Sequence, residues 1–159
     1  MKKLNIGCGK DFIQGYINID IQPLGGVDLA IDVKLGLPFE DESIDEICCY
    51  NFIHILSKKE WREFKKEITR VLKPRGKLCL VLHDADFIFR AFLEDKDGEK
   101  WDWWRQCVYG AQLNEHDFIK NMFNYKKLTE DLWEEGMVDF VNETPEDERM
   151  SVVCHKQKL

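Results

Sequence analysis

The chain contains little proline and has no long hydrophobic runs. The second absence limits the classes of protein to which it can belong. Only 4 of its 159 residues are prolines, and its apolar runs are far shorter than the roughly 20 residues that cross a bilayer. The start, Met1 to Lys3, leads directly into a strand-like pattern without the apolar stretch of a signal peptide. We therefore expect one soluble globular domain spanning residues 1–159, with no membrane partner and a cytoplasmic location.

Basic charge is scarce as well. The chain has 23 lysines and arginines against 30 aspartates and glutamates, which gives a net charge of −7. Binding to a phosphate backbone needs a clustered basic face, whereas the lysines between 58 and 66 alternate with acids. We expect no nucleic-acid partner and favour a small-molecule or saccharide-type substrate. The sequence leaves the oligomeric state open.

Cysteine pairs with metal-binding spacing are also missing. Six cysteines are present, but none forms a CxxC pair, and most lie inside apolar, strand-like runs. Because an export signal is missing too, we expect reduced, mostly buried thiols and no metal site.

Short apolar segments recur along the first half of the chain. Continuous runs of this kind are typical of parallel strands that are covered on both faces. They predict strands at residues 3–6, 16–19, 27–31, 44–50 and 77–82.

Helices are expected mainly in the second half. The stretch from Ser57 to Glu60 has the pattern of a capping box, and an apolar stripe follows it as far as the stop at Pro74-Arg75-Gly76. Residues 84–125 are rich in aromatics and predict two or three short helices over the substrate side of the sheet. A last helix at 127–135 precedes closing strands at 137–141 and 150–155, joined by a polar hairpin at 142–149.

The most informative motif is the glycine turn in Leu4 to Lys10, followed by a short strand that ends at Asp20. A carboxylate at such a strand end can accept hydrogen bonds from both hydroxyls of a ribose, and bare glycine backbone lets a nucleoside approach. Only about ten residues separate Gly9 from Asp20, so a full crossover helix does not fit. We expect a vestigial turn there.

These elements resemble, in order, the class I S-adenosylmethionine-dependent methyltransferases, in particular a small, type 11-like branch. The matching segments are LNIGCGK, GYINIDI, VDLAIDVKLGLPFEDESIDEI, VLKPRGKLCLVL and the late YGAQLNEHDFIKNMFNYKKLTEDLWEEGM. In the fourth of these segments, Arg75 replaces the first of two expected glycines. The resemblance implies an α/β, Rossmann-like three-layer sandwich. Its seven-stranded, mostly parallel sheet has an antiparallel last strand and helices on both faces.

The resemblance implies S-adenosylmethionine as the cofactor, held first by the glycine turn. Gly7, Cys8 and Gly9 would cradle its amino acid part through backbone amides; the alternative is an ordinary tight turn. Asp20 would bind the ribose, and the alternative is an aspartate that caps a turn.

The adenine end and the methyl end would involve later residues. Asp32 resembles the acid that receives the adenine amino group, with Val33 beside it and Ile21 as an apolar wall; the alternative for Asp32 is a loop cap. In the loop after residue 50, where this branch usually has an H-x-x-E-H-like pattern, Asn51 stands in place of the first histidine. His54 stands there in place of the glutamate.

A general base is needed only if the acceptor must lose a proton. The candidates are His83 and Asp84 at a strand end and His54 in the preceding loop, although a structural role is the alternative for each histidine. The aromatic segment either packs on the sheet or lines the acceptor pocket. The expected substrate contacts are Tyr109, Gln112 and His116.

Three functions compete at this point. The first is an S-adenosylmethionine-dependent methyltransferase, and the second is a non-catalytic relative that binds the cofactor or a partner. A nicotinamide-dependent oxidoreductase is the third, but it lacks the full G-x-G-x-x-G because Ile13 stands at the third glycine position.

Overall fold

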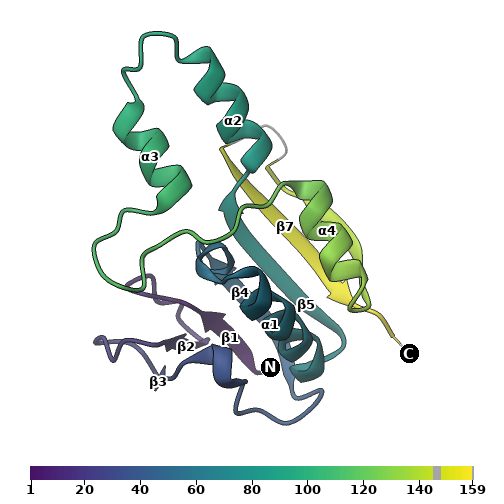
Figure 1. The fold of residues 1–159 in the computed structure, drawn as a ribbon. Coiled ribbons are helices and arrows are strands. Elements are labelled where there is room, and N and C mark those ends of the chain that lie inside the picture. Colours follow the sequence, from purple (N-terminus) through teal and green to yellow (C-terminus); the bar gives the residue numbers. More distant parts are fainter. Residues whose placement is uncertain (145–147, 159) are drawn as a thin grey trace.

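The structure is a computed structural model that describes residues 1–144 and 148–158, so residues 145–147 of the expected hairpin lie outside the described residues. Seven strands and four α-helices follow one another along the described part of the chain (Figure 1). They are β1 (Lys3–Ile6), β2 (Ile17–Asp20), β3 (Leu29–Ala30), β4 (Ile44–Tyr50), α1 (Lys58–Val71), β5 (Leu72–His83), α2 (Ala85–Glu94), α3 (Trp101–Tyr109), α4 (Tyr125–Trp133), β6 (Met137–Asn142) and β7 (Arg149–Lys156). Two short 3₁₀ turns, Val33–Leu35 and Ile53–Ile55, follow β3 and β4.

The strands form one sheet in the order β3-β2-β1-β4-β5-β7-β6. The first five strands pair in parallel, while β7 runs antiparallel between β5 and β6 (Figure 1). This arrangement confirms the expected seven-stranded, mostly parallel sheet. It also brings the carboxyl ends of β1, β2, β4 and β5 to one edge, where open α/β sheets bind their ligands.

Two strand boundaries differ from the sequence prediction. β3 has two residues instead of five; just before it, the Asp28 amide still donates to the Asn18 carbonyl, but the Asn18 amide donates to the Asp28 carboxylate instead of to a backbone carbonyl. β5 begins earlier than expected, at Leu72, which already has extended backbone angles and pairs with Ile44. Helix α1 therefore ends three residues before Pro74, and the Pro-Arg-Gly turn lies inside the strand.

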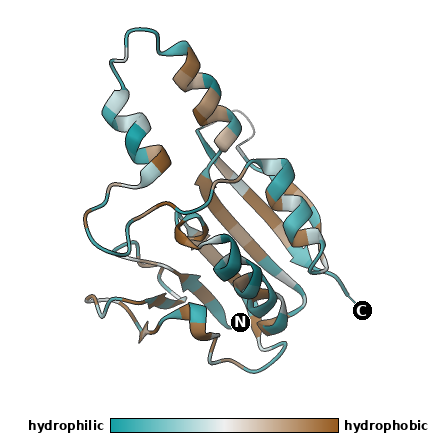
Figure 2. Cartoon of the chain, viewed as in Figure 1, coloured by the Kyte–Doolittle hydropathy of each residue, from teal (hydrophilic) through white to brown (hydrophobic). Residues whose placement is uncertain are grey.

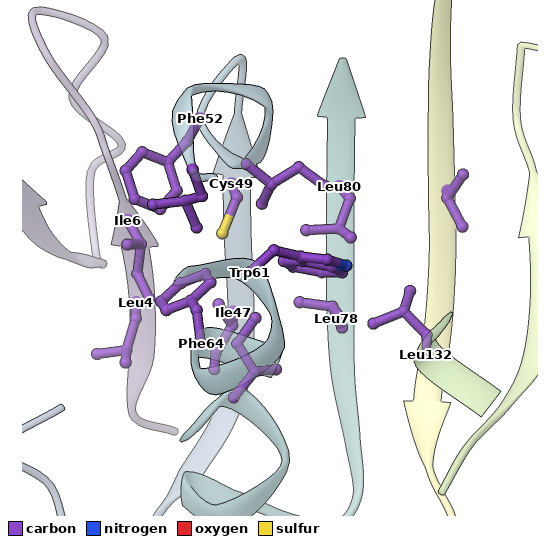
Figure 3. Close-up of a cluster of buried hydrophobic side chains, with 14 of the residues drawn as sticks. Leu4, Ile6, Ile47, Cys49, Phe52, Trp61, Phe64, Leu78, Leu80 and Leu132 are labelled. Atoms are coloured by element: carbon purple, nitrogen blue, oxygen red, sulfur yellow. The ribbon is translucent and has the colours of Figure 1, made fainter. Parts of the chain in front are cut away.

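One face of the sheet carries the main core. Apolar side chains of α1, among them Trp61, Phe64 and Ile68, lie against the buried residues of β1, β4 and β5 (Figure 3). Helix α4 adds Leu128 and Leu132 to the same cluster. Figure 2 shows the matching pattern, with hydrophobic central strands behind helices that carry hydrophilic residues outward. Both helices thus cover the same face.

The opposite face is built differently. Its cluster contains Cys48, Cys79 and Val153, with Tyr16 packed beside them, and no residue of a helix belongs to it. The chain between β1 and β2 is a turn, as expected from the short spacing, and the β2 to β3 connection has no helix either. The resemblance implies helices on both faces of the sheet. In the described part of the chain, helices cover one face only.

Helices α2 and α3 extend beyond the carboxyl ends of the strands (Figure 1). They pack on each other through Ile88, Trp104 and Cys107, a small cluster separate from the main core. The break between them falls at residues 95–100, where the indole of Trp104 donates to Asp95 Oδ2 over 2.7 Å. None of the helices described is both long and apolar enough to cross a membrane.

Candidate functional site

A cavity of about 590 Å³ opens at the carboxyl ends of the parallel strands. This volume lies in the range of small-molecule and cofactor sites. One wall comes from the glycine turn, the end of β2, the turn after β3 and the loop after β4, and the other comes from α3 and residues 110–120. Nine of the predicted site residues line it: Gly7, Asp20, Ile21, Asp32, Val33, Asn51, His54, His83 and His116.

The glycine turn is tightly bound within the protein. The amides of Gly7 and Cys8 both donate to the carbonyl of Ile19, and the amide of Gly9 donates to the Asp20 carboxylate. Gly7 has a φ of 68°, and a Cβ built there would lie 2.2 Å from the ring of Phe52. The turn thus lets Phe52 lie directly against the backbone, while Cys8 and Gly9 do not line the cavity.

Asp20 ends β2 at the edge of the cavity. Its Oδ2 accepts from the Gly9 amide over 2.8 Å, and its Oδ1 accepts from the Gln22 amide over 2.9 Å. The side chain therefore caps the turn, as the alternative interpretation foresaw, and also faces the cavity. Each carboxylate oxygen can accept more than one hydrogen bond, so both keep acceptor capacity for a ligand.

Asp32 caps the 3₁₀ turn that follows β3. Its Oδ1 accepts from the Lys34 amide over 3.0 Å, and its Oδ2 lies 3.5 Å from the Lys34 ammonium group. That ammonium group is also 3.6 Å from Glu60, which is 4.0 Å from Lys120 on the opposite wall. A chain of alternating charges therefore joins the expected adenine end to the segment that covers the cavity.

The loop after β4 enters the cavity in a left-handed turn. Asn51 has a φ of 48°, and its amide donates to the Val81 carbonyl over 2.7 Å. The carbonyl of His54 accepts from the amides of Lys120 and Asn121 over 2.9 and 3.0 Å. The loop with the unusual sequence therefore holds the far wall in place through its backbone.

His54 and His83 are two of the predicted histidines that line the cavity. His54 comes from the loop after β4 and His83 from the end of β5, and both are half-buried. Burial, with the neighbouring His83 as a second cause, lowers the pKa of His54 to about 4. Burial and the charge of Arg149 also lower the pKa of His83 below its ordinary value. Both imidazoles are therefore neutral near pH 7.

Besides Cys8 and Gly9, three predicted residues do not line the cavity. Asp84 caps α2 by accepting from the Asp86 amide over 2.9 Å. Tyr109 is 58% exposed, and Gln112 lies in an exposed left-handed turn. Among the aromatics of this segment, Trp103 lines the cavity whereas Trp104 is buried in the α2 to α3 cluster.

Several lining residues were not found from the sequence. They are mainly polar and charged side chains of α3, of the loop after it and of the start of β7: Gln106, Asn114, Glu115, Asp117, Lys120, Glu148 and Arg149. No local motif marks them, because they reach the cavity only through the pairing of β7 with β5 and the path of the loop. Across residues 1–144 and 148–158, no three His, Cys, Asp or Glu side chains are grouped to hold a metal ion.

Part of the chain matches a family of known proteins. A family model described as a methyltransferase domain matches residues 23–80, which run from the approach to β3 as far as the middle of β5. The match covers 58 of the 159 residues, so this part of the chain is similar to a methyltransferase domain. The matched region includes Asp32 and the loop after β4, whereas Gly7 and Asp20 lie before it.

Two relatives in sequence match this chain over different lengths. An uncharacterized methyltransferase of Schizosaccharomyces pombe is 40% identical over 60 residues, 38% of this chain and 23% of that protein. An uncharacterized protein of Methanocaldococcus jannaschii is 31% identical over 100 residues, 55% of this chain and 43% of its own length. The matches thus span less than half of these two relatives.

A likeness in fold extends over almost the whole chain. A crystal structure titled as a SAM-dependent methyltransferase of Methanosarcina mazei superimposes with a TM-score of 0.68 and 20% sequence identity. The superposition covers 99% of this chain and 93% of that one.

Proposed function

We propose that this chain binds S-adenosylmethionine in the cavity and transfers its methyl group to a small-molecule or saccharide-type acceptor. The observation that carries the proposal is Asp20, a carboxylate at the tip of a parallel strand that faces a cavity of cofactor size. The match of residues 23–80 to a methyltransferase domain supports the cofactor, and the position of the cavity at the carboxyl ends of the strands supports its placement.

The residues around the cavity fit such a ligand. Asp20 keeps free acceptor capacity for two sugar hydroxyls, and a charge-assisted bond of this kind is about twice as strong as a neutral one. Ile21 and Val33 supply apolar contacts where a purine would lie, with Asp32 beside them to receive its amino group. The glycine turn would let the ligand come close to the backbone. It has no free amides to offer, because all three of its amides already donate within the protein.

When bound, S-adenosylmethionine supplies an electrophilic methyl group on a sulfonium, and its transfer disperses positive charge. The protein can therefore act mainly by orienting the two reactants and excluding water. Phe52 and Trp103 line the cavity with apolar surface, and residues 110–120 form its outer wall. Hydrogen bonds from Lys120 and Asn121 to the His54 carbonyl hold that wall over the cavity.

A second candidate is a non-catalytic relative that keeps the binding site. It is favoured by the loop after β4, where Asn51 and His54 replace the residues usual in this branch, and by the position of Asp84 outside the cavity. A panel of lysate acceptors separates the two candidates, because methyl transfer to any of them argues for an enzyme.

We also propose a cytoplasmic location and no nucleic-acid or membrane partner. All six cysteines are buried free thiols, a state typical of proteins from reducing compartments. The net charge of −7 supports the absence of a nucleic-acid partner.

Calorimetry with S-adenosylhomocysteine tests the proposal. We expect Asp20→Ala to weaken binding at least about tenfold, because one charge-assisted hydrogen bond contributes about 1.5 to 3 kcal/mol. Asp11→Ala is the matched control, since this exposed residue follows the same turn and does not line the cavity. Equal affinity of the two variants, with both folded, would remove the ribose contact from the account.

A further inference from the structure

His54 and His83 share an unusual feature. The Nδ1 atom of each is buried and has no hydrogen-bond partner among the described residues, although both side chains line the cavity. When the Nδ1 side of a half-buried imidazole is covered by protein, the exposed part of the ring is the side that carries Nε2. In both residues, Nε2 is therefore the nitrogen that a ligand in the cavity can reach.

The sealed nitrogen also decides where the single proton of each neutral ring resides. A proton on Nδ1 would leave a buried N–H donor without an acceptor, and the accessible Nε2 would then have no proton to donate. The proton is therefore better placed on Nε2, where water or a ligand can accept it. Both rings then present a donor to the cavity.

The surrounding charges favour an electron-rich ligand at this end. Arg149 pairs with His83 across β5 and β7 and lines the same cavity. At His83 the positive charge of Arg149 has a larger effect than the negative charge of Glu148, whereas Asp117 acts on His54. A hydrogen-bond acceptor with negative charge would meet two neutral donors beside an arginine.

We propose that His54 and His83 donate hydrogen bonds from Nε2 to a carboxylate of the methyl acceptor. The inference rests on the proposed function, because it names a chemical class for the acceptor at that same site. It gives the two histidines a binding role, which differs from the general-base role expected from the sequence. A base would need a lone pair on the accessible nitrogen, and here that nitrogen holds the proton.

The tautomers are measured directly by NMR on protein with ¹⁵N-labelled histidine. This experiment needs no ligand and no activity. We expect both His54 and His83 to be neutral at pH 7 with the proton on Nε2, assigned through His54→Gln and His83→Gln. A proton on Nδ1 in either residue would overturn the proposal.

Ligand chemistry is tested with benzoate, benzamide and benzylamine as probes of matched size. They are titrated into protein saturated with S-adenosylhomocysteine, and the Nε2 signals of the two histidines are followed. We expect benzoate to bind at least about tenfold more tightly than benzylamine, with benzamide between them. Equal binding of the three probes, or tighter binding of benzylamine, would contradict a carboxylate site.

Variants separate donation from simple packing. His83→Gln keeps an N–H donor and should retain most of the benzoate affinity, whereas His83→Leu should lose about tenfold. His155→Gln is the control, because the Nδ1 of His155 is also buried but its side chain does not line the cavity. Failure to bind S-adenosylhomocysteine would count against the proposed function, while the tautomer result would still decide the role of the histidines.

Discussion

At the scale of single residues, Gly7 and Phe52 show how the turn is built. The ring of Phe52 lies where a side chain of residue 7 would begin, and Gly7 also has positive φ. Phe52 belongs to the main core and makes an edge-to-face contact with Phe64 of α1, with 5.5 Å between the two ring centroids (Figure 3). The glycine of the expected cofactor motif therefore has a packing role whatever the cavity binds.

Gly7→Ala should lower the free energy of unfolding by about 2 to 5 kcal/mol. The estimate combines the cost of left-handed backbone for a residue with a Cβ and the cost of overpacking. Chemical denaturation measures it, with Gly25→Ala as the control, because that glycine has open space around it and no positive φ. Equal stability of the two variants would refute the packing role, and partial recovery in Gly7→Ala with Phe52→Leu would support it.

The buried imidazole of His54 predicts a pH dependence of stability. Its pKa is about 4 in the folded protein against 6.5 ordinarily, so the unfolded chain binds more protons between these values. Stability is therefore complete above about pH 6.5 and falls by up to about 3 kcal/mol as the pH drops toward 4.

Unfolding of the wild type and of His54→Gln at several pH values between 7 and 4.5 isolates this contribution. We expect the loss of stability to be smaller in the variant, with the remaining slope due partly to His83, whose pKa is also lowered. The same slope in both proteins would show that folding does not lower the pKa of His54.

Sequence reasoning found the residues of the first wall of the cavity, because they follow strand ends in known spacing. Asp20, Asp32 and Asn51 are examples, and the structure brings all three to one cavity. Whether they bind the cofactor stays a prediction. Arg149 could not be found, since it reaches the cavity only through its pairing opposite His83 across two strands that are 66 residues apart.

At the scale of elements, α1 was predicted best because its signals are local. Ser57 Oγ accepts from the Glu60 amide, and the Glu60 carboxylate accepts from the Ser57 amide, which completes the expected capping box. The C-terminus of the helix was predicted less well. The chain becomes extended at Leu72 because that residue pairs with Ile44, and no local signal marks such a pairing.

Ser57→Ala should destabilise the protein by about 1 kcal/mol through loss of the cap. Thermal or chemical denaturation measures the change. Glu60→Gln is an informative companion, since glutamine can keep the capping box while the charge that faces Lys34 and Lys120 is lost. If Glu60→Gln lost stability and Ser57→Ala did not, the stabilisation at this end of the helix would come from the charges and not from the cap.

At the scale of the whole molecule, the seven-stranded sheet with its antiparallel last strand followed from the resemblance rather than from periodicity. Local patterns identify strands but do not say that β7 inserts between β5 and β6. The helix-free face departs from what the resemblance implies, and the spacing explains it, because the residues between β1 and β2 are too few for a crossover helix. Lys3, Glu46 and Lys77 form ion pairs on strands of this face.

A crystal structure of the protein with S-adenosylhomocysteine tests the central claim most directly. The account predicts the nucleoside in the cavity, with both ribose hydroxyls within hydrogen-bond distance of the Asp20 carboxylate and the sulfur directed toward His54 and His83. A nucleoside bound elsewhere, or a ribose that leaves Asp20 without a ligand contact, would contradict it.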